Sequence, residues 1–473
     1  MLPEAYDVVI IGAGPSGMGA AGVLAEYPLK VLLIDENNQV GGQIWRKPAY
    51  KPVRRFASPR PPALQMDLST AADTQKKNLD IITPACVLGV FPEKHLLVST
   101  ADKSVKEIKA RRIIFATGAR EKVRPFGGWT LPGVMTLGAA QILLKYYGVL
   151  ASSKILIAGA GPLVYLLSSQ IIGAGGKVTT VLDRSSPTAM FNAMGVMAGQ
   201  LPQIGQGLLA LGRLIKNRVS IRHRMQVVEV RGNGKCQEVI AAKIAPDGIM
   251  VPGSQKRYET QMLACGNGFV PNIELPQLAG CDLTYAADQG GWIVKVNRSM
   301  ETSLSGIFAA GEITGIAGGD KALIEGRLAA LTILNQFGKL NVKKHRIRQT
   351  ALLTKRRRRQ RFGAFLNRQW AIHPREWAGI DDATIICRCE DITMGTIRRW
   401  IQEGFTSAPD LKKATRCGMG NCQGRTCAPL IYDILAAYSV TGKRGPHPLS
   451  VRTPVKPIPL GDLAKNNSFV VSP

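Results

Sequence analysis

The first hydrophobic run of the chain has the pattern of a buried strand, a glycine turn, a helix and a second strand. It covers residues 6–35, YDVVIIGAGPSGMGAAGVLAEYPLKVLLID, and holds one continuous apolar stretch near each end. Short apolar stretches bounded by turn residues are typical of strands buried on both faces of a sheet. We therefore predict a parallel β-α-β unit at the start of the chain.

Five later stretches continue this alternation of strands and turns. KILIAGAGPLVY (154–165) repeats the strand and the glycine turn, VTTVLDR (178–184) predicts the strand after it, and LACG (263–266) a terminal strand. Two further strands are predicted at RRIIFATGA (111–119) and GIFAAGE (306–312). The arrangement resembles flavoproteins that contain two dinucleotide-binding domains, one of them inserted into the other.

The C-terminal part changes to short amphipathic helices. One helix is predicted to begin near Thr393 and another after Asp410, and residues 428–438, APLIYDILAAY, form a third. The apolar positions that we expect to face inward in the first are Ile397, Trp400 and Ile401. This pattern predicts a small helical domain.

Composition agrees with a globular protein of about three domains. Apolar residues make up 45% and charged residues 20% of the 473 residues. The odd number of cysteines, 9, and the lack of a basic segment ahead of Tyr6 favour a reducing cytoplasm. Residues 155–176 form an uncharged run long enough to span a bilayer, but Gly-Ala-Gly-Pro within it favours strand, turn and helix.

The formal net charge of +28 is large, and much of it lies in residues 343–369. Such a basic block can bind nucleic acid or an acidic membrane surface. No nucleic-acid-binding fold accompanies it, so we expect no nucleic acid partner. We interpret the block as a solvated linker helix or as a contact surface for an acidic partner.

The first glycine turn has the spacing of a dinucleotide-binding loop. Gly12, Gly14 and Gly17 form G-x-G-x-x-G, which permits a tight turn, a close approach of pyrophosphate and close packing of helix on strand. The phosphates would lie at the helix N-terminus, where free N–H groups attract anions. Asp35, 23 residues after Gly12, ends the second strand where an acid binds an adenosine ribose.

The second glycine turn is incomplete. Val164 stands at the third glycine position, where a branched side chain moves the helix off the strand and narrows the room for pyrophosphate. Asp183 is correctly placed for a ribose, but Arg184 follows it. No Cys-x-x-Cys lies near either loop, which argues against disulfide-reductase chemistry. We predict that this half does not bind NAD(P)H productively.

Five of the nine cysteines fall within residues 387–427. Their pattern is Cys387-x-Cys389, 27 residues, and then Cys417-x4-Cys422-x4-Cys427. Thiolates in such numbers indicate an iron–sulfur cluster or a zinc site, although zinc sites usually have C-x2-C pairs. Inert core thiols are the third alternative, and this is the role we expect for Cys86, Cys236, Cys265 and Cys281.

The Cys-x-Cys pair followed by a distant glycine-rich pair resembles the small [2Fe–2S] domain of bacterioferritin-associated ferredoxin. The resemblance implies Cys387, Cys389, Cys422 and Cys427 as the cluster ligands. Cys417 stands where that pattern has alanine, so it is a neighbour of the cluster or a substitute ligand.

Resemblance to flavoproteins identifies the first nucleotide as FAD. Gly41-Gly42-Gln43 follows the acidic residue, as in flavoprotein disulfide reductases and amine oxidases. Glu312 stands where these proteins usually carry an aspartate that contacts the ribityl chain. The resemblance implies a set of FAD-binding positions: Gly12, Gly14, Pro15, Ser16, Gly17, Asp35, Glu36, Gly42, Gln43, Val87, Thr117, Gly118, Gly311 and Glu312.

Together these parts resemble the A (alpha) subunit of two-component bacterial flavin amine oxidases. That group includes opine oxidases, hydroxyproline dehydrogenases and hydrogen cyanide synthase. The most specific stretches are residues 116–141 and TRCGMGNCQGRTC (415–427). The implied fold is an α/β flavoprotein with a split FAD domain, an inserted Rossmann-like domain and a small helical [2Fe–2S] domain. The implied segments are 1–125 with 285–340 (FAD), 126–284 (degenerate NAD-type), 341–375 (basic linker), 376–442 ([2Fe–2S]) and 443–473 (Pro-rich tail).

The resemblance also implies a division of labour. A B (beta) subunit similar to D-amino-acid oxidases would oxidise an opine or imino acid, and this chain would transfer the electrons. We accordingly find no catalytic residues of its own. FMN at the subunit interface, a small ferredoxin-like subunit and a peripheral position at the inner membrane are further expectations. The alternatives are a hydrogen cyanide synthase-type subunit and a stand-alone NAD(P)H-dependent flavin reductase.

Overall fold

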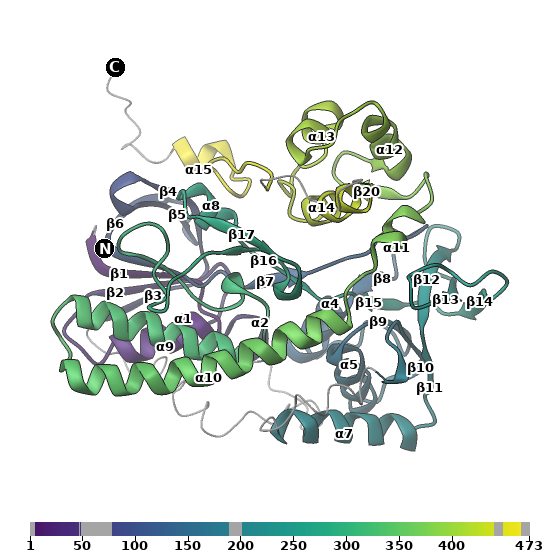
Figure 1. Ribbon diagram of the computed structural model, residues 1–473, viewed down its shortest axis with the longest axis horizontal. Coiled ribbons are helices and arrows are strands. Elements are labelled where there is room, and N and C mark those ends of the chain that lie inside the picture. The colour runs from purple at the N-terminus through teal and green to yellow at the C-terminus, as the bar shows by residue number, and fades with distance from the viewer. Residues whose placement is uncertain (1–4, 47, 49–77, 189–200, 439–447, 465–473) are drawn as a thin grey trace.

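The computed structural model describes residues 5–46, 48, 78–188, 201–438 and 448–464. Figure 1 shows two sheets with their helices side by side, a long helix that runs beneath the first sheet and ends at the second domain, and a small helical unit above the junction. Parts of the predicted tail, 443–447 and 465–473, lie outside the described residues.

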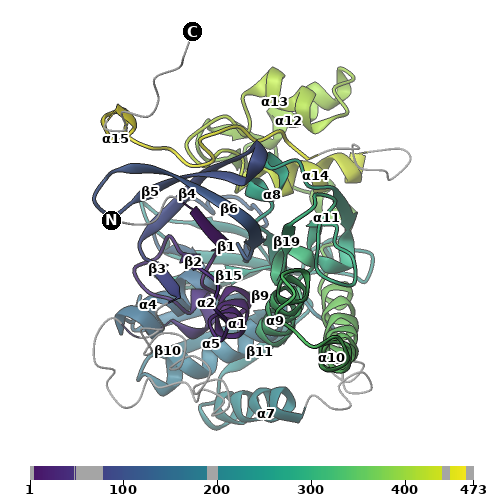
Figure 2. The same ribbon diagram turned by 90° about the vertical axis from the view of Figure 1, so that its left-hand side faces the viewer.

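The first sheet has the strand order β3-β2-β1-β6-β5-β4, with β19 beside β6. Strands β3, β2, β1, β6 and β19 run parallel, while β5 and β4 are antiparallel. The strands are β1 (Ala5–Ile11), β2 (Val31–Ile34), β3 (Leu79–Ile82), β4 (Ala85–Phe91), β5 (His95–Thr100), β6 (Val105–Phe115) and β19 (Ile307–Ala309). Helices α1 (Pro15–Leu24) and α9 (Gly319–Gln336) cover one face, as Figure 2 shows, and α2 (Gly42–Trp45) lies near the glycine turn.

Glycines allow the two covering helices to lie very close together. A Cβ on Gly326 of α9 would come within 1.9 Å of the backbone oxygen of Ser16, and one on Gly17 within 1.8 Å of the Gly12 oxygen. Helix α1 therefore rests directly on its own glycine turn and on α9. This contact brings the predicted phosphate loop next to the loop that follows β19.

The second sheet has the order β11-β10-β9-β15-β8 and is parallel wherever its pairs are described. Its strands are β8 (Val134–Thr136), β9 (Lys154–Gly159), β10 (Lys177–Asp183), β11 (Ser220–His223) and β15 (Leu263–Gly266), with helices α4 (Leu137–Tyr147), α5 (Pro162–Gly173) and α7 (Leu201–Lys216). An antiparallel sheet lies beside it: β12 (Met225–Arg231), β13 (Glu238–Lys243) and β14 (Lys256–Glu259). The short pair β7 (Ala119–Glu121) and β16 (Phe269–Pro271) links the two halves. Helix α8 (Glu274–Leu278) and the pair β17 (Leu283–Ala286) and β18 (Gly291–Val294) lead back to the first sheet.

The basic block forms helix α10 (Val342–Gln369), which packs along α9. Several of its arginines form ion pairs inside the chain: Arg356 with Glu325, Arg359 with Asp320 and Arg368 with Asp288. Part of the basic block therefore fastens the helix to the first domain. Within the described residues, no helix is both long and apolar enough to cross a membrane.

The small C-terminal unit contains the predicted helices around a two-stranded sheet. Its elements are α11 (Pro374–Ala378), β20 (Ile385–Cys387), β21 (Ile392–Thr393), α12 (Met394–Gln402), α13 (Ala408–Thr415) and α14 (Cys427–Tyr438). Helix α13 begins at Ala408 rather than after Asp410, because the Ser407 side chain caps it by accepting from the Asp410 amide. Residues 451–459 then run extended over β4, where the Val455 amide donates to the Leu88 oxygen, and α15 (Leu460–Ala464) follows.

Candidate functional site

The glycine turn after β1 forms an open cradle at the start of α1. Gly12 has φ +105°, and a Cβ there would lie 2.3 Å from the backbone oxygen of Ala116 on the neighbouring strand. A Cβ on Gly14, by contrast, would lie in almost empty space, with the Gly42 Cα 3.9 Å away as its one neighbour within 4 Å. An anion can therefore approach the backbone at Gly14 and meet the N–H groups of the helix N-terminus, where Pro15 is the first helical residue.

Two polar groups beside the cradle fit a dinucleotide. Ser16 is 4% exposed, and its Oγ has no hydrogen-bond partner within the protein. Asp35 is buried and accepts from the Ala13 amide at 2.7 Å through one oxygen and from the Asn37 amide at 2.9 Å through the other. A buried hydroxyl without a partner at a helix N-terminus is a group that a bound phosphate would satisfy.

A hollow of about 440 Å³ begins at Glu36 and Asn37, the two residues that follow Asp35. Glu36 and Leu88 line it from the sheet side, and Lys456 of the extended C-terminal segment closes it by an ion pair with Glu36. Val87 lies on β4 with its side chain 4% exposed, so a cofactor contact there would come from its backbone. The C-terminal segment, distant in sequence, therefore forms part of this wall.

The remaining positions inferred from resemblance lie around the same loop. Gly42 approaches Gly14, and a Cβ on it would lie 2.7 Å from the Gly14 Cα, whereas the Gln43 side chain is exposed. Gly118 has φ +69° with open space around its Cβ position, and Thr117 Oγ1 donates to the Asn272 oxygen. Of these, Gly118 leaves room for a ligand to approach the backbone, whereas Gly42 allows the close contact with Gly14.

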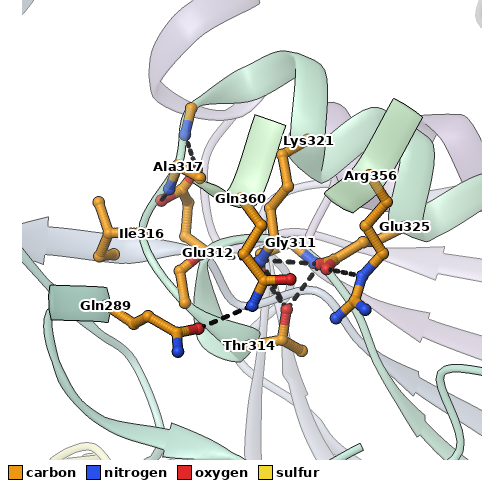
Figure 3. A network of polar contacts seen from close by, with 12 residues as sticks. Gln289, Gly311, Glu312, Thr314, Ile316, Ala317, Lys321, Glu325, Arg356 and Gln360 are labelled. Carbon is orange, nitrogen blue, oxygen red and sulfur yellow. Dashed lines mark hydrogen bonds and ion pairs between the residues drawn. The ribbon is translucent and has the colours of Figure 1, made fainter. Parts of the chain in front are cut away.

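Glu312 does not point freely into the cradle. Its carboxylate accepts from the Gly318 amide at 2.7 Å and from the Ala317 amide at 3.1 Å. Burial raises the pKa of Glu312 above its ordinary value. The side chain, which the resemblance places against the ribityl chain, holds the loop that leads into α9 through these two contacts (Figure 3), and its contact with the ribityl chain stays a prediction.

A buried charge cluster, which the sequence did not predict, lies behind this loop. Lys321 and Glu325 on α9 are fully buried, with Nζ 3.0 Å from Oε2, and Arg356 of α10 binds the other carboxylate oxygen at 2.6 Å. Glu325 also accepts from the Gly311 amide and the Thr314 hydroxyl, as Figure 3 shows. In the sequence, the i,i+4 spacing of Lys321 and Glu325 on a helix could have indicated this ion pair.

The same cluster sets the charge states of its members. Burial alone would raise the pKa of Glu325, but the charges of Lys321 and Arg356 hold it below the ordinary value. Burial lowers the pKa of Lys321. Since Lys321 Nζ donates to the Gly311, Gly315 and Thr314 oxygens at 2.7–2.9 Å, the pair fixes the whole turn after β19.

The corresponding loop of the second domain is covered. The ring of Trp370, just after α10, would lie 3.3 Å from a Cβ on Gly161, the position equivalent to open Gly14. Asp183 is engaged by Ser185, by the Tyr165 hydroxyl and by His223 at 3.5 Å. The chain itself therefore takes the places where a pyrophosphate and a ribose would bind.

The five C-terminal thiols lie together. The sulfur atoms of Cys387, Cys417 and Cys427 are buried and all within 4.8 Å of one another. Cys422 hydrogen-bonds with Cys427 and with Cys389, which is the exposed member. These contacts join all five sulfur atoms into one continuous group.

Backbone N–H groups face this group, as a thiolate-bound cluster requires. The amides of Gly418 and Glu390 donate to the Cys387 sulfur, and those of Gly424 and Thr426 to the Cys422 sulfur. Hydrogen bonds, led by that from Cys427, lower the pKa of Cys422 to about 4. The donor set of soft thiolates fits a [2Fe–2S] cluster, with Cys387, Cys389, Cys422 and Cys427 as its proposed ligands.

The remaining cysteines lie apart from this group. Cys236 and Cys281 are buried, as predicted for core thiols, while Cys86 and Cys265 are half-buried. Burial raises the pKa of Cys265 to about 12, which keeps it an inert thiol. Cys417, in contrast, is as buried as any of these and contacts two proposed ligands.

Comparison with known families gives two matches that together cover most of the chain. The pyridine nucleotide-disulphide oxidoreductase family matches residues 6–329, and the BFD-like [2Fe-2S] binding domain matches residues 385–437. These matches confirm the predicted fold class and the two predicted cofactors, FAD and [2Fe–2S].

Curated proteins with full-length similarity include two kinds of oxidoreductase component. The opine oxidase A subunit of Rhizobium meliloti is 32% identical over 98% of this chain and 88% of its own length. Its counterpart in the opine oxidase of Agrobacterium tumefaciens is 33% identical over 98% of this chain and 92% of its own. The HcnB component of hydrogen cyanide synthase from Pseudomonas protegens is 31% identical over 95% of this chain and 96% of its own length.

Solved structures share the fold. L-proline dehydrogenase from P. horikoshii superposes with a TM-score of 0.68 and 23% identity over 97% of this chain and 79% of that one. Thioredoxin reductase from T. acidophilum superposes with a TM-score of 0.50 and 19% identity over 71% of this chain and 99% of that one.

Proposed function

Because this chain belongs to the pyridine nucleotide-disulphide oxidoreductase family and to the group of opine oxidase A subunits, carrying FAD and [2Fe–2S], we propose that it is the electron-transfer subunit of a heteromeric amine oxidase or dehydrogenase. The amine, an opine or a hydroxyproline-type imino acid, is oxidised on a partner similar to D-amino-acid oxidases. Electrons then reach this chain, with FMN at the interface between the two.

The covered second domain supports a partner rather than NAD(P)H as the electron source. Trp370 lies on Gly161, and Arg184 is held by Glu376 at 2.7 Å instead of facing a nucleotide. Val164 is fully buried in the domain core at the third glycine position. A bound NAD(P)H would have to displace a tryptophan and break a buried ion pair, which is energetically costly.

A direct contact between the two cofactor-binding units supports transfer within the chain. Arg120, which follows the Thr117-Gly118 loop, donates to the Arg425 backbone oxygen at 2.8 Å, between Cys422 and Cys427. The same guanidinium binds Asn272 at 2.7 Å, and Asn272 donates to the Thr117 oxygen at 2.9 Å. Hydrogen bonds therefore connect the predicted flavin loop with the loop that carries two proposed ligands.

This contact is reinforced on both sides. Lys122 pairs with Asp433 of α14, Trp129 Nε1 donates to the Ile385 oxygen at 2.8 Å, and Arg120 pairs with Glu274 at 2.8 Å. When bound, a flavin accepts electrons in pairs and releases them singly, and a [2Fe–2S] cluster carries one electron at a time. The role of these residues is to hold the two units in a fixed relation.

The test is to purify the chain alone and with a co-expressed D-amino-acid-oxidase-like partner, under anaerobic conditions. We expect octopine, nopaline, proline or hydroxyproline to bleach the flavin of the complex, and none of them to bleach the chain alone. NADH and NADPH should reduce neither sample. Rapid reduction of the isolated chain by NADH would contradict the proposal and favour the stand-alone reductase.

The second candidate is a hydrogen cyanide synthase-type subunit, favoured by the full-length similarity to HcnB. Glycine as electron donor distinguishes it. Cyanide formed from glycine by the complex, without turnover of opines or imino acids, would establish this alternative.

A further inference from the structure

The C-terminal strap, residues 449–459, runs from the small C-terminal unit to the first sheet. At its start, the Leu449 amide donates to the Tyr432 hydroxyl of α14 at 2.6 Å. Further along, the Val455 oxygen accepts at 2.7 Å from the guanidinium of Arg425, which lies between two proposed cluster ligands. The strap is therefore attached to the unit that carries the five thiols.

Strand β4 has a surface that receives the strap. The Val455 amide donates to the Leu88 oxygen at 2.8 Å, and Val455 is 3% exposed within the core of the first domain. Gly89 provides the space, because a Cβ on it would lie 2.9 Å from the Thr453 Cγ2 atom. These contacts fix the path of the strap without the side chain of the next residue, Lys456.

The strap positions Lys456 beside two acidic residues. Its ammonium pairs with Glu36 at the edge of the hollow that begins at Glu36 and Asn37. Burial lowers the pKa of Lys456 and the charge of Asp35 opposes this effect, so the ammonium also lies within range of the Asp35 carboxylate. An ion pair between partly exposed groups adds little stability, so the fold itself gains little from this lysine.

The hollow combines apolar and polar surface, as a site for an aromatic base with its sugar requires. Its lining includes Leu88, Pro457 and Ile458 on the apolar side and Asn37, Ser99 and Asp462 on the polar side. Asp35, at the position where an acid binds the adenosine ribose, directly precedes it in the chain. The Lys456 ammonium carries three N–H donors, of which the pair with Glu36 can engage one. Ribose hydroxyls and adenine nitrogens are acceptors for the others.

We propose that the strap forms the outer wall of the adenosine site of FAD and that Lys456 binds the adenosine half of the cofactor. The inference rests on the FAD-containing subunit proposed above. The first domain supplies the phosphate cradle, whereas this lysine comes from a segment that follows the thiol-bearing unit in the chain. A cofactor held from both sides dissociates more slowly than one held by the cradle alone.

Two single substitutions of the full-length chain test this. Lys456→Ala removes the ammonium, and Arg452→Ala removes an exposed positive charge from the same strap as the matched control. FAD is removed from each protein, and the affinities for FAD and for ADP, which carries the adenosine half alone, are measured by isothermal titration. FAD release from the loaded proteins is followed by flavin fluorescence, and the thermal unfolding of the FAD-free proteins is recorded.

We expect Lys456→Ala to weaken the binding of FAD and of ADP by the same factor, roughly 10-fold, as for the loss of a hydrogen bond from a charged donor, and to speed FAD release. Arg452→Ala should match the wild type, and the FAD-free proteins should unfold at the same temperature. Unchanged FAD affinity in Lys456→Ala would overturn the inference and leave the proposed function intact. A loss of affinity for FAD but not for ADP, or a lower unfolding temperature of FAD-free Lys456→Ala, would also overturn it. A wild-type chain that binds no FAD would contradict both.

Discussion

Removing Glu325 tests whether the buried charge cluster holds the turn beside the predicted flavin site. The side chains of Glu325 and Lys321 are both 0% exposed, and Arg356 is the third charge. Glu325→Ala leaves Lys321 as a buried ammonium whose remaining hydrogen-bond partners are three neutral oxygens, with Glu312 as a further acidic group nearby. It also removes the acceptor of the Gly311 amide and the Thr314 hydroxyl.

The magnitude follows from the burial of the pair. Breaking a fully buried ion pair on one side costs about 3–5 kcal/mol, because the other charge stays buried without a counterion. The three oxygens that still accept from Lys321 place the cost near the lower end of that range. For a domain of this size the melting temperature should fall by roughly 10 °C.

The assay is thermal and urea unfolding of the wild type, Glu325→Ala and the double variant Glu325→Ala/Lys321→Met, with FAD release followed by flavin fluorescence. The double variant should recover most of the lost stability, since it removes both fully buried charges and leaves Arg356, whose side chain is 15% exposed, as the remaining charge of the cluster. FAD should dissociate more readily from the single variant. A single variant within about 1 kcal/mol of the wild type, or a double variant that is no more stable than the single one, would refute the reasoning.

Three further outcomes are expected. Gly326→Ala should destabilise the chain by more than about 2 kcal/mol, because its Cβ would lie 1.9 Å from a backbone oxygen of α1, whereas Gly22→Ala, with nothing within 4 Å, should be neutral or stabilising by unfolding assays. The Asp183 carboxylate, 3.5 Å from the imidazole Nδ1, raises the pKa of His223 above 6.5. Below that pH the wild type should be more stable than His223→Gln by roughly 0.5–1 kcal/mol, and it should lose this advantage as the pH rises through the folded-state pKa. An equal stability difference at about pH 5.5 and pH 9 would contradict this. Cys389→Ser should lose iron but keep FAD, while Cys86→Ser should keep both, and full iron retention in Cys389→Ser would show that the exposed thiol is not a ligand.

The sequence predicted those features that depend on short-range pattern. The glycine turn at Gly12, the strands on either side of it and helix α14 all form where periodicity and turn residues indicate. Local motifs indicated a dinucleotide, from consecutive backbone amides at a glycine turn, and a thiolate-bound metal, from thiols spaced along one segment, and resemblance to known proteins identified these as FAD and [2Fe–2S]. Family comparison confirmed the fold class and both cofactors.

What the sequence did not predict depends on contacts between distant segments. Trp370 reaches Gly161 because it directly follows α10, whose C-terminal end lies at the second domain. Arg356 completes the pair on α9 from a helix whose charges could equally have been solvated. The sequence also did not predict that the Glu312 carboxylate accepts from the amides of Ala317 and Gly318, while its predicted contact with the ribityl chain stays a prediction.

The most direct test of the central claim is the cofactor content of the chain after anaerobic purification. Absorption spectra, with flavin, iron and acid-labile sulfide assays, should give one FAD, two irons and two sulfides per chain. A colourless protein without flavin or iron would contradict the account. Zinc in place of iron would contradict its C-terminal half.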